Sequence, residues 1–155
     1  MNKKPVSGLD IDEDEYRGNN IVGKPMIPIG AVAGFTTSGD YSVRYEDCER
    51  YVVPEFDKYN YEFLIRLSGS SMYPKYSNGD ILACCEVETI LFFQWGKIYV
   101  IDSSQGALVK RVYEDIDNPD NVILVSENKE KYPPFAIPKS DIRRLFIVLG
   151  VIRVE

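Results

Sequence analysis

The chain has 155 residues, of which 24 are Asp or Glu, 18 are Lys or Arg and none is His, so its formal net charge is −6. The absence of histidine excludes a Ser-His-Asp triad, a Cys-His pair and a His-ligated zinc site. The acidic balance argues against broad electrostatic binding to nucleic acid, which needs a cationic surface. With 45% hydrophobic residues, the chain has enough apolar surface for one domain with its own core.

Residues 1–25 differ in composition from the rest of the chain. Five acids lie between residues 8 and 15, and glycines and asparagines follow. Such a segment cannot bury enough apolar surface to offset the entropy of ordering it. We therefore predict an acidic flexible arm or linker over residues 1–25 and a single domain over residues 26–155. The arm is too short and too acidic to be a helix-turn-helix domain.

Runs rich in β-branched and aromatic residues follow one another from Pro25 to the end of the chain. Alternation is clearest where Phe63, Ile65 and Leu67 would share one face of a strand. Because helical periodicity is weak everywhere, we predict a mostly β fold, with a mainly antiparallel sheet folded over into a partial barrel. A glycine-containing loop at residues 103–106 favours a β-hairpin. The predicted strands cover residues 61–67, 80–85, 97–102, 107–113, 121–126 and 145–154.

Cysteine usage and the lack of a targeting segment indicate a cytoplasmic protein. Cys48, Cys84 and Cys85 are odd in number, and neighbouring strand residues face opposite sides, so we expect reduced thiols. The N-terminus lacks an apolar signal core, and the longest apolar run, residues 145–151, is too short to span a membrane. The sequence offers no metal motif and predicts no cofactor.

The first candidate for chemistry is a turn of small residues at positions 67–74, where a predicted strand ends. Nucleophilic serines occupy such places because nearby N–H groups can bind a developing oxyanion. Serine and glycine also populate turns for conformational reasons alone, and local composition by itself favours that simpler interpretation.

The second candidate is Lys110, which shares a strand face with the apolar residues Leu108 and Val112. Burial disfavours the charged amine and lowers its pKa from an ordinary value of about 10.4. A neutral lysine can take a proton from a serine hydroxyl, which is the Ser-Lys form of nucleophilic catalysis. The alternative is that Lys110 reaches solvent beside Arg111 and stays charged. Periodicity alone favours neither.

The residues around these two positions resemble a known family. Residues 69–74 and 78–81 are similar to the Gly-x-Ser-Met-x-Pro…Gly-Asp signature of the LexA-type serine peptidases, which include LexA, self-cleaving phage repressors and the polymerase accessory protein UmuD. Residues 106–112 resemble the lysine strand of that family. The resemblance covers roughly residues 25–155 and implies the fold of the LexA C-terminal domain.

The resemblance also implies roles for individual residues. The family's nucleophile directly precedes methionine, which selects Ser71, and Lys110 follows it by 39 residues as general base. Backbone N–H groups of Ser70, Ser71 and Met72 would hold the oxyanion. Ser70 stands where relatives commonly have an acidic residue or methionine, a departure that leaves the dyad intact.

A third element is the small dipeptide Ala33-Gly34, which lies 38 residues before Ser71. Family members cut their own chain at such a dipeptide, usually Ala-Gly. Small side chains let the backbone enter a narrow cleft and present the Ala33 carbonyl to the nucleophile. The resemblance therefore implies self-cleavage between Ala33 and Gly34.

Three functions follow from these observations. The first is the self-cleaving and dimerisation domain of a phage-type or LexA-like repressor, which would reach DNA only through a helix-turn-helix domain absent from this chain. The second is a UmuD-like accessory protein of the SOS response, partnered by a polymerase and a recombinase filament. The third is a non-catalytic β dimerisation module. For the homodimer, residues 145–154 offer an expected edge strand that a second copy could cover.

Overall fold

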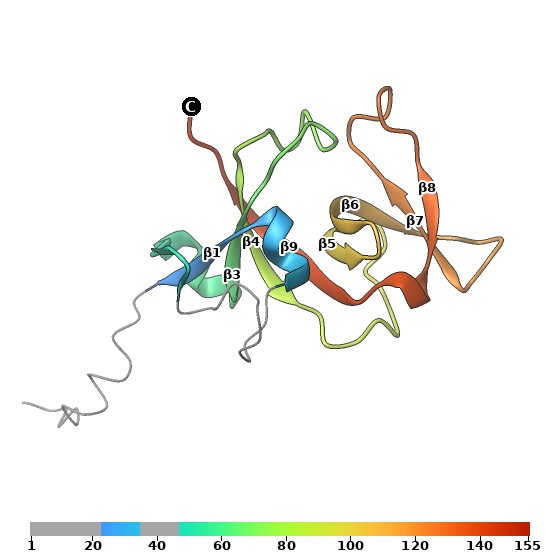
Figure 1. The fold of residues 1–155 in the computed structure, drawn as a ribbon, viewed down its shortest axis with the longest axis horizontal. Coiled ribbons are helices and arrows are strands. Elements are labelled where there is room, and N and C mark those ends of the chain that lie inside the picture. The colour runs from blue at the N-terminus through green and yellow to red at the C-terminus, as the bar shows by residue number, and fades with distance from the viewer. Residues whose placement is uncertain (1–22, 35–46) are drawn as a thin grey trace, which may run out of the picture.

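The computed structural model describes residues 23–34 and 47–155 (Figure 1). The predicted arm lies almost wholly outside these ranges and stays a prediction, although a strand already begins at Lys24. In chain order the elements are β1 (Lys24–Pro28), the 3₁₀ helix η1 (Ile29–Gly34), β2 (Arg50–Tyr51), the 3₁₀ helix η3 (Pro54–Tyr59), β3 (Phe63–Arg66), β4 (Ile81–Glu86), β5 (Ile98–Ser103), β6 (Gly106–Glu114), β7 (Asn121–Val125), β8 (Phe135–Pro138), the 3₁₀ helix η4 (Lys139–Asp141) and β9 (Arg144–Ile152).

The described strands form one open sheet in the order β2-β1-β3-β4-β9-β5-β6-β7-β8, so the predicted mostly β fold is confirmed. Every neighbouring pair is antiparallel except β1 and β3, which run parallel. The predicted hairpin is confirmed as β5 and β6, whose register closes with Ser103 opposite Gly106. Gly106 has a φ of +94°, which glycine adopts without strain and which the tight turn requires.

The position of β9 corrects one prediction. Residues 145–154 were expected at an edge of the sheet, but β9 lies inside it, between β4 and β5 (Figure 1). Its first half, from Arg144 to Ile147, pairs with β5, and residues 146–152 pair with β4. From Val148 onward, β9 therefore has a strand on one side only within the described residues. A run of apolar residues does not by itself distinguish a central strand from an edge strand.

Side chains on the two faces of the sheet form separate core clusters. On β5, Ile98 and Val100 enter one cluster, whereas Tyr99 and Ile101 enter the other. The first cluster also contains Phe63, Ile65 and Leu67, as their alternation predicts, together with residues of η1, β4, β6 and β9. Each fully buried aliphatic side chain of this kind contributes about 1.5–3 kcal/mol.

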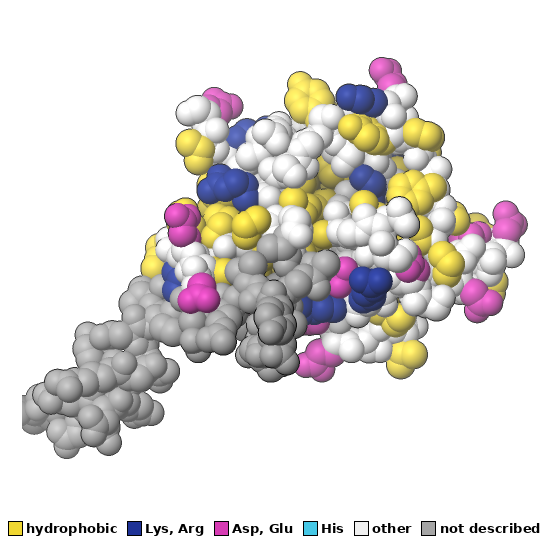
Figure 2. All heavy atoms as spheres, viewed as in Figure 1, with side chains coloured by type: hydrophobic (Ala, Val, Ile, Leu, Met, Phe, Trp, Pro, Cys, Tyr) yellow, Lys and Arg dark blue, Asp and Glu magenta, His cyan; other side chains and the backbone are white. Residues whose placement is uncertain are grey.

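The cysteines and the surface carry no sign of an alternative chemistry. No disulfide links the three cysteines, and Cys84 is buried in the core while Cys85 faces Glu62, as expected for strand neighbours. On the face shown in Figure 2, cationic and anionic side chains of the described residues are scattered, with no continuous basic strip among them. No helix in residues 23–34 or 47–155 is long and apolar enough to cross a bilayer.

Candidate active site

The turn that carries Ser71 is fixed at both ends. Where β3 ends, Leu67 donates its N–H to the carbonyl of Asp80 and accepts from the N–H of Gly79, both at 2.8 Å. Within the turn, the neighbouring Met72 is only 1% exposed and belongs to the first core cluster. Because Met72 is anchored in the core, the half-buried Ser71 beside it is held at the boundary between core and surface.

Lys110 lies in the middle of β6, opposite Tyr99 in register. Its side chain is only 6% exposed, and in the described part of the chain no carboxylate forms an ion pair with it. Burial lowers the pKa of the Lys110 amine below its ordinary value, because the charged form loses its hydration. Of the two sequence-based alternatives for this lysine, the structure therefore shows the buried one.

Ser71 and Lys110 line the same cleft, which has a volume of about 380 Å³. It opens between the turn after β3, the first half of β6 and the connection from β7 to β8. A hydroxyl and an amine with a depressed pKa thus share one partly closed space. The remaining lining residues are Ile29, Leu67, Ser68, Gly69, Ser70, Ala107, Leu108, Val109, Tyr132 and Phe135.

The backbone amides around Ser71 divide into used and available ones. The N–H of Gly69 donates to Asn78 Oδ1 at 3.0 Å, and the N–H of Tyr73 donates to the carbonyl of Ser70 at 3.2 Å. Within the described residues, the three amides between them, those of residues 70–72, donate no hydrogen bond. These are the amides that the sequence analysis assigned to an oxyanion.

The dipeptide Ala33-Gly34 forms the end of η1. This helix contacts β5 and β6, and its Val32 is buried in the first core cluster. Ile29, at the other end of η1, lines the cleft that holds Ser71 and Lys110. The segment with the expected cleavage site therefore starts at the cleft, although the side chains of Ala33 and Gly34 lie outside the described ones.

The connection between β7 and β8 holds two residues that the sequence analysis did not assign to the site. Asn128 donates its backbone N–H to the carbonyl of Ser71 at 3.0 Å and its Nδ2 to the carbonyl of Ser70 at 3.2 Å. The Tyr132 hydroxyl lies 3.3 Å from Ser70 Oγ, and the Nζ of Lys110 lies 5.9 Å from the centre of its ring. An asparagine and a tyrosine in a polar loop give no local signal for these contacts.

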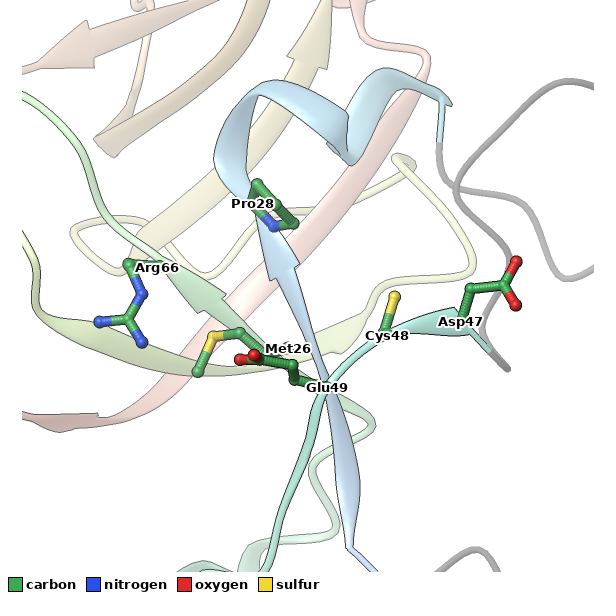
Figure 3. Close-up of a pocket in the computed structure, with 6 residues that line it drawn as sticks. All are labelled: Met26, Pro28, Asp47, Cys48, Glu49 and Arg66. Atoms are coloured by element: carbon green, nitrogen blue, oxygen red, sulfur yellow. The ribbon is translucent and has the colours of Figure 1, made fainter.

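A second cavity, of about 310 Å³, lies between β1, β3 and residues 47–49 (Figure 3). It contains the thiol of Cys48, but burial, with a further contribution from Asp47, raises the pKa of that thiol. A thiol with a raised pKa is a poor nucleophile at neutral pH. In Figure 3, Arg66 and Met26 stand on one side of the cavity and Cys48 on the other. No cluster of described Cys, Asp or Glu residues could hold a metal ion.

Comparisons with known proteins point to one family. A family model described as Peptidase S24-like matches residues 25–152. Over 88 residues, the chain is 32% identical to a Haemophilus influenzae protein described as an uncharacterized HTH-type transcriptional regulator. That alignment covers 56% of this chain and 34% of the relative, so the chain spans about a third of the relative's length.

Proposed function

Because this chain belongs to the Peptidase S24-like family, we propose that it is a self-cleaving serine peptidase domain of a LexA-like transcriptional repressor. Ser71 is the nucleophile, Lys110 is the general base, and the bond between Ala33 and Gly34 is cut. The observation that carries this proposal is the burial of Lys110, without an ion pair among the described residues, in the cleft that Ser71 also lines. A buried, unpaired lysine destabilises a fold, so its presence indicates a use, and a base for a serine is such a use.

The reaction proceeds in two halves. The neutral Nζ of Lys110 takes the proton of Ser71 Oγ as that oxygen attacks the carbonyl carbon of Ala33. The resulting ammonium then gives the proton to the nitrogen of Gly34, the peptide bond breaks, and Ala33 is left as an ester on Ser71. In the second half, water attacks the ester and Lys110 takes one proton of the water. Lys110 then returns this proton to Ser71 Oγ as the ester bond breaks, and the acid formed on Ala33 releases its own proton to solvent and becomes a carboxylate.

The free amides of Ser70, Ser71 and Met72 supply the electrostatic part of the mechanism. A tetrahedral intermediate carries its negative charge on the former carbonyl oxygen of Ala33. Amides that are already oriented and unused cost no reorganisation when this charge forms, and removal of one such donor typically costs about 10²–10³-fold in rate. The unused donors of residues 70–72 support this assignment.

The expected cleavage site lies only a few residues along the chain from the cleft. Ile29 lines the cleft, and Ala33 follows four residues later. Four residues span about 8 Å in a 3₁₀ helix and about 13 Å when extended. Unwinding of η1 at the cleft therefore suffices to change the distance of the Ala33 carbonyl from Ser71 by several ångströms.

The biological output follows from the relative as well as from the chemistry. The Haemophilus influenzae relative is described as an HTH-type transcriptional regulator. In a repressor of that type, cleavage at Ala33-Gly34 separates a DNA-binding part from the part that dimerises, and repression is lost. A recombinase filament or another inducer is the partner that would trigger the cut.

The decisive experiment is incubation of the full chain at alkaline pH, followed by intact mass measurement. We expect two fragments, one ending at Ala33 and one starting at Gly34. Ser71→Ala and Lys110→Ala each abolish them, whereas Ser104→Ala and Lys97→Ala, outside the cleft, leave them unchanged. An uncut wild-type chain at pH 10 would contradict the proposal and favour a non-catalytic β module.

Dimerisation is the second part of the proposed function. From Val148 to Ile152, β9 pairs only with β4 among the described strands, and Val151 is 41% exposed. A second copy could pair along this half-open stretch around a two-fold axis. Sedimentation should give a dimer at micromolar concentration, weakened by Val151→Lys and unaffected by Ile116→Lys in the β6–β7 hairpin. A wild-type chain that stays monomeric at high micromolar concentration would contradict this part.

A further inference from the structure

We propose that Tyr132 is a positioning residue of the cleft: its ring covers the Lys110 amine and keeps water from it, and its hydroxyl holds the ring in place through Ser70. This inference deepens the proposed function, on which its catalytic consequence rests. It adds a second role to the β7–β8 connection, which also contacts the turn of Ser71 through Asn128.

The ring of Tyr132 stands beside the Lys110 amine. Tyr132 lines the same cleft as Lys110 and Ser71, and it is half-buried. The Nζ of Lys110 lies 5.9 Å from the ring centre. An aromatic ring in this place excludes water from one side of the amine. Loss of that ring would expose the amine to solvent.

Hydrogen bonds to the turn of Ser71 anchor the Tyr132 ring. The Tyr132 hydroxyl shares a hydrogen bond with Ser70 Oγ, at 3.3 Å. The Tyr132 N–H donates to the carbonyl of Asn128, and Asn128 in turn donates to the carbonyls of Ser70 and Ser71. Both ends of the segment from Asn128 to Tyr132 are thus hydrogen-bonded to the turn at residues 68–72, which we call the nucleophile turn. The ring and the turn are held as one unit beside the Lys110 amine.

The charged and titratable neighbours of Lys110 are engaged with other partners. From β5, Tyr99 faces it in register, and the Tyr99 hydroxyl accepts the Gln94 N–H at 2.9 Å. On β6 itself, the adjacent Arg111 is paired with Glu127. From η1, the nucleophile turn at residues 68–72 and β8, no acidic or basic side chain is presented to the amine.

The remaining cation beside the ring is Lys131, whose Nζ lies 5.6 Å from the Tyr132 ring centre. A ring next to a cation attracts it, which on its own would favour the charged form of Lys110. Exclusion of water acts in the opposite direction, and the pKa of Lys110 is lowered with burial as its cause. The Tyr132 ring contributes to that burial, so we expect its net effect to be a lowering of the pKa of Lys110.

The test measures Lys110 directly, in a Ser71→Ala background that does not cleave itself. The ¹³Cε resonance of Lys110, assigned by Lys110→Arg, is titrated from pH 6 to 11 in three variants. We expect Tyr132→Ala to raise the Lys110 midpoint by about one pH unit, and Tyr132→Phe, which keeps the ring, to move it less than half as far. Tyr59→Ala is the matched control, because Tyr59 also stands beside a lysine, at 5.1 Å from Lys58 Nζ, but outside the cleft.

An unchanged midpoint in Tyr132→Ala would overturn the inference, as would a shift in Tyr132→Phe equal to that in Tyr132→Ala. If Tyr132→Ala does not fold, Tyr132→Phe decides: a rise of half a pH unit or more would show that the hydroxyl, and not the ring, sets the midpoint. In the Ser71 protein, the pH-rate profile of cleavage should shift with the Lys110 midpoint. A shifted midpoint in a chain that never cleaves would leave this inference standing and refute the proposed function, whereas cleavage with an unmoved midpoint would do the reverse.

Discussion

Arg153 binds the carboxylate of Asp80 through two nitrogens: Nε lies 3.0 Å from Oδ1, and Nη2 lies 2.8 Å from Oδ2. Asp80 is only 2% exposed and also accepts the N–H of Ser77 at 2.7 Å. The backbone carbonyl of Asp80 accepts the N–H of Leu67, just before the nucleophile turn starts. The residue that directly follows β9 thus stabilises the base of the turn that carries Ser71.

This relationship predicts a pH dependence of stability. The Arg153 guanidinium lowers the pKa of the Asp80 carboxyl in the folded chain. A carboxyl with a lowered folded pKa stabilises the fold above its unfolded pKa of about 3.9 and loses that contribution as pH falls through the folded value. We expect Asp80→Asn to lower the melting temperature at pH 7 and to lose much of that effect below pH 3. Thermal unfolding at both values measures it, and an equal deficit at both would contradict the role of the ion pair.

Substitution of Lys110 should have the opposite effect on stability to substitution of Asp80: the variant gains stability and loses activity. Its amine has a lowered pKa in the folded chain, so below that pKa the fold bears the cost of a buried charge. Lys110→Met removes the cost, and the free energy of unfolding at pH 7 should rise while cleavage disappears. The gain should shrink as pH rises between the folded pKa and the ordinary value of about 10.4, because the amine is then neutral in both states.

Chemical denaturation at pH 7 and at pH 10.5 measures this change. Lys97→Met replaces an exposed lysine and should alter stability little at either pH. If Lys110→Met is less stable than the wild type at pH 7, the lysine is contributing to the fold, and the view that it is retained for chemistry is wrong.

Much of the fold was accessible from the sequence, because strand alternation and turn glycines are local. The alternation of Phe63, Ile65 and Leu67 predicts their common core cluster, and the loop at residues 103–106 predicts the hairpin. The resemblance to the LexA-type peptidases is confirmed by the family match over residues 25–152. It rested on short motifs whose spacing carries more information than composition does.

The features that could not be predicted from the sequence depend on contacts between distant segments. The parallel pairing of β1 with β3 and the inner position of β9 are decided by which strands meet, and hydrophobicity does not encode that choice. Asn128 and Tyr132 reach the nucleophile turn across 58 and 62 residues of sequence. In their own loop they look like ordinary polar residues.

Asn128 therefore gives a prediction that separates positioning from stability. Asn128→Ala removes the hydrogen bond to the Ser70 carbonyl, which costs about 1 kcal/mol of stability. It should also lower the cleavage rate roughly 10- to 100-fold, because the turn shifts relative to Lys110. Asn118→Ala, in the β6–β7 hairpin, also loses a hydrogen bond and is the matched control. If both variants cleave at the wild-type rate, Asn128 has no positioning role.

Packing of η3 against β9 provides a prediction that does not depend on catalysis. A Cβ added at Gly150 would lie 2.6 Å from Cε1 of Phe56, which is closer than side chains approach in folded proteins. Gly150→Ala should therefore destabilise the fold by about 1–3 kcal/mol, since the buried Phe56 ring has to move. Phe56→Leu shortens the opposing side chain, so the double variant should lose less stability than the sum of the two single variants. Urea denaturation of the four proteins measures this coupling, and strictly additive losses would show that the ring and residue 150 do not compete for the same space.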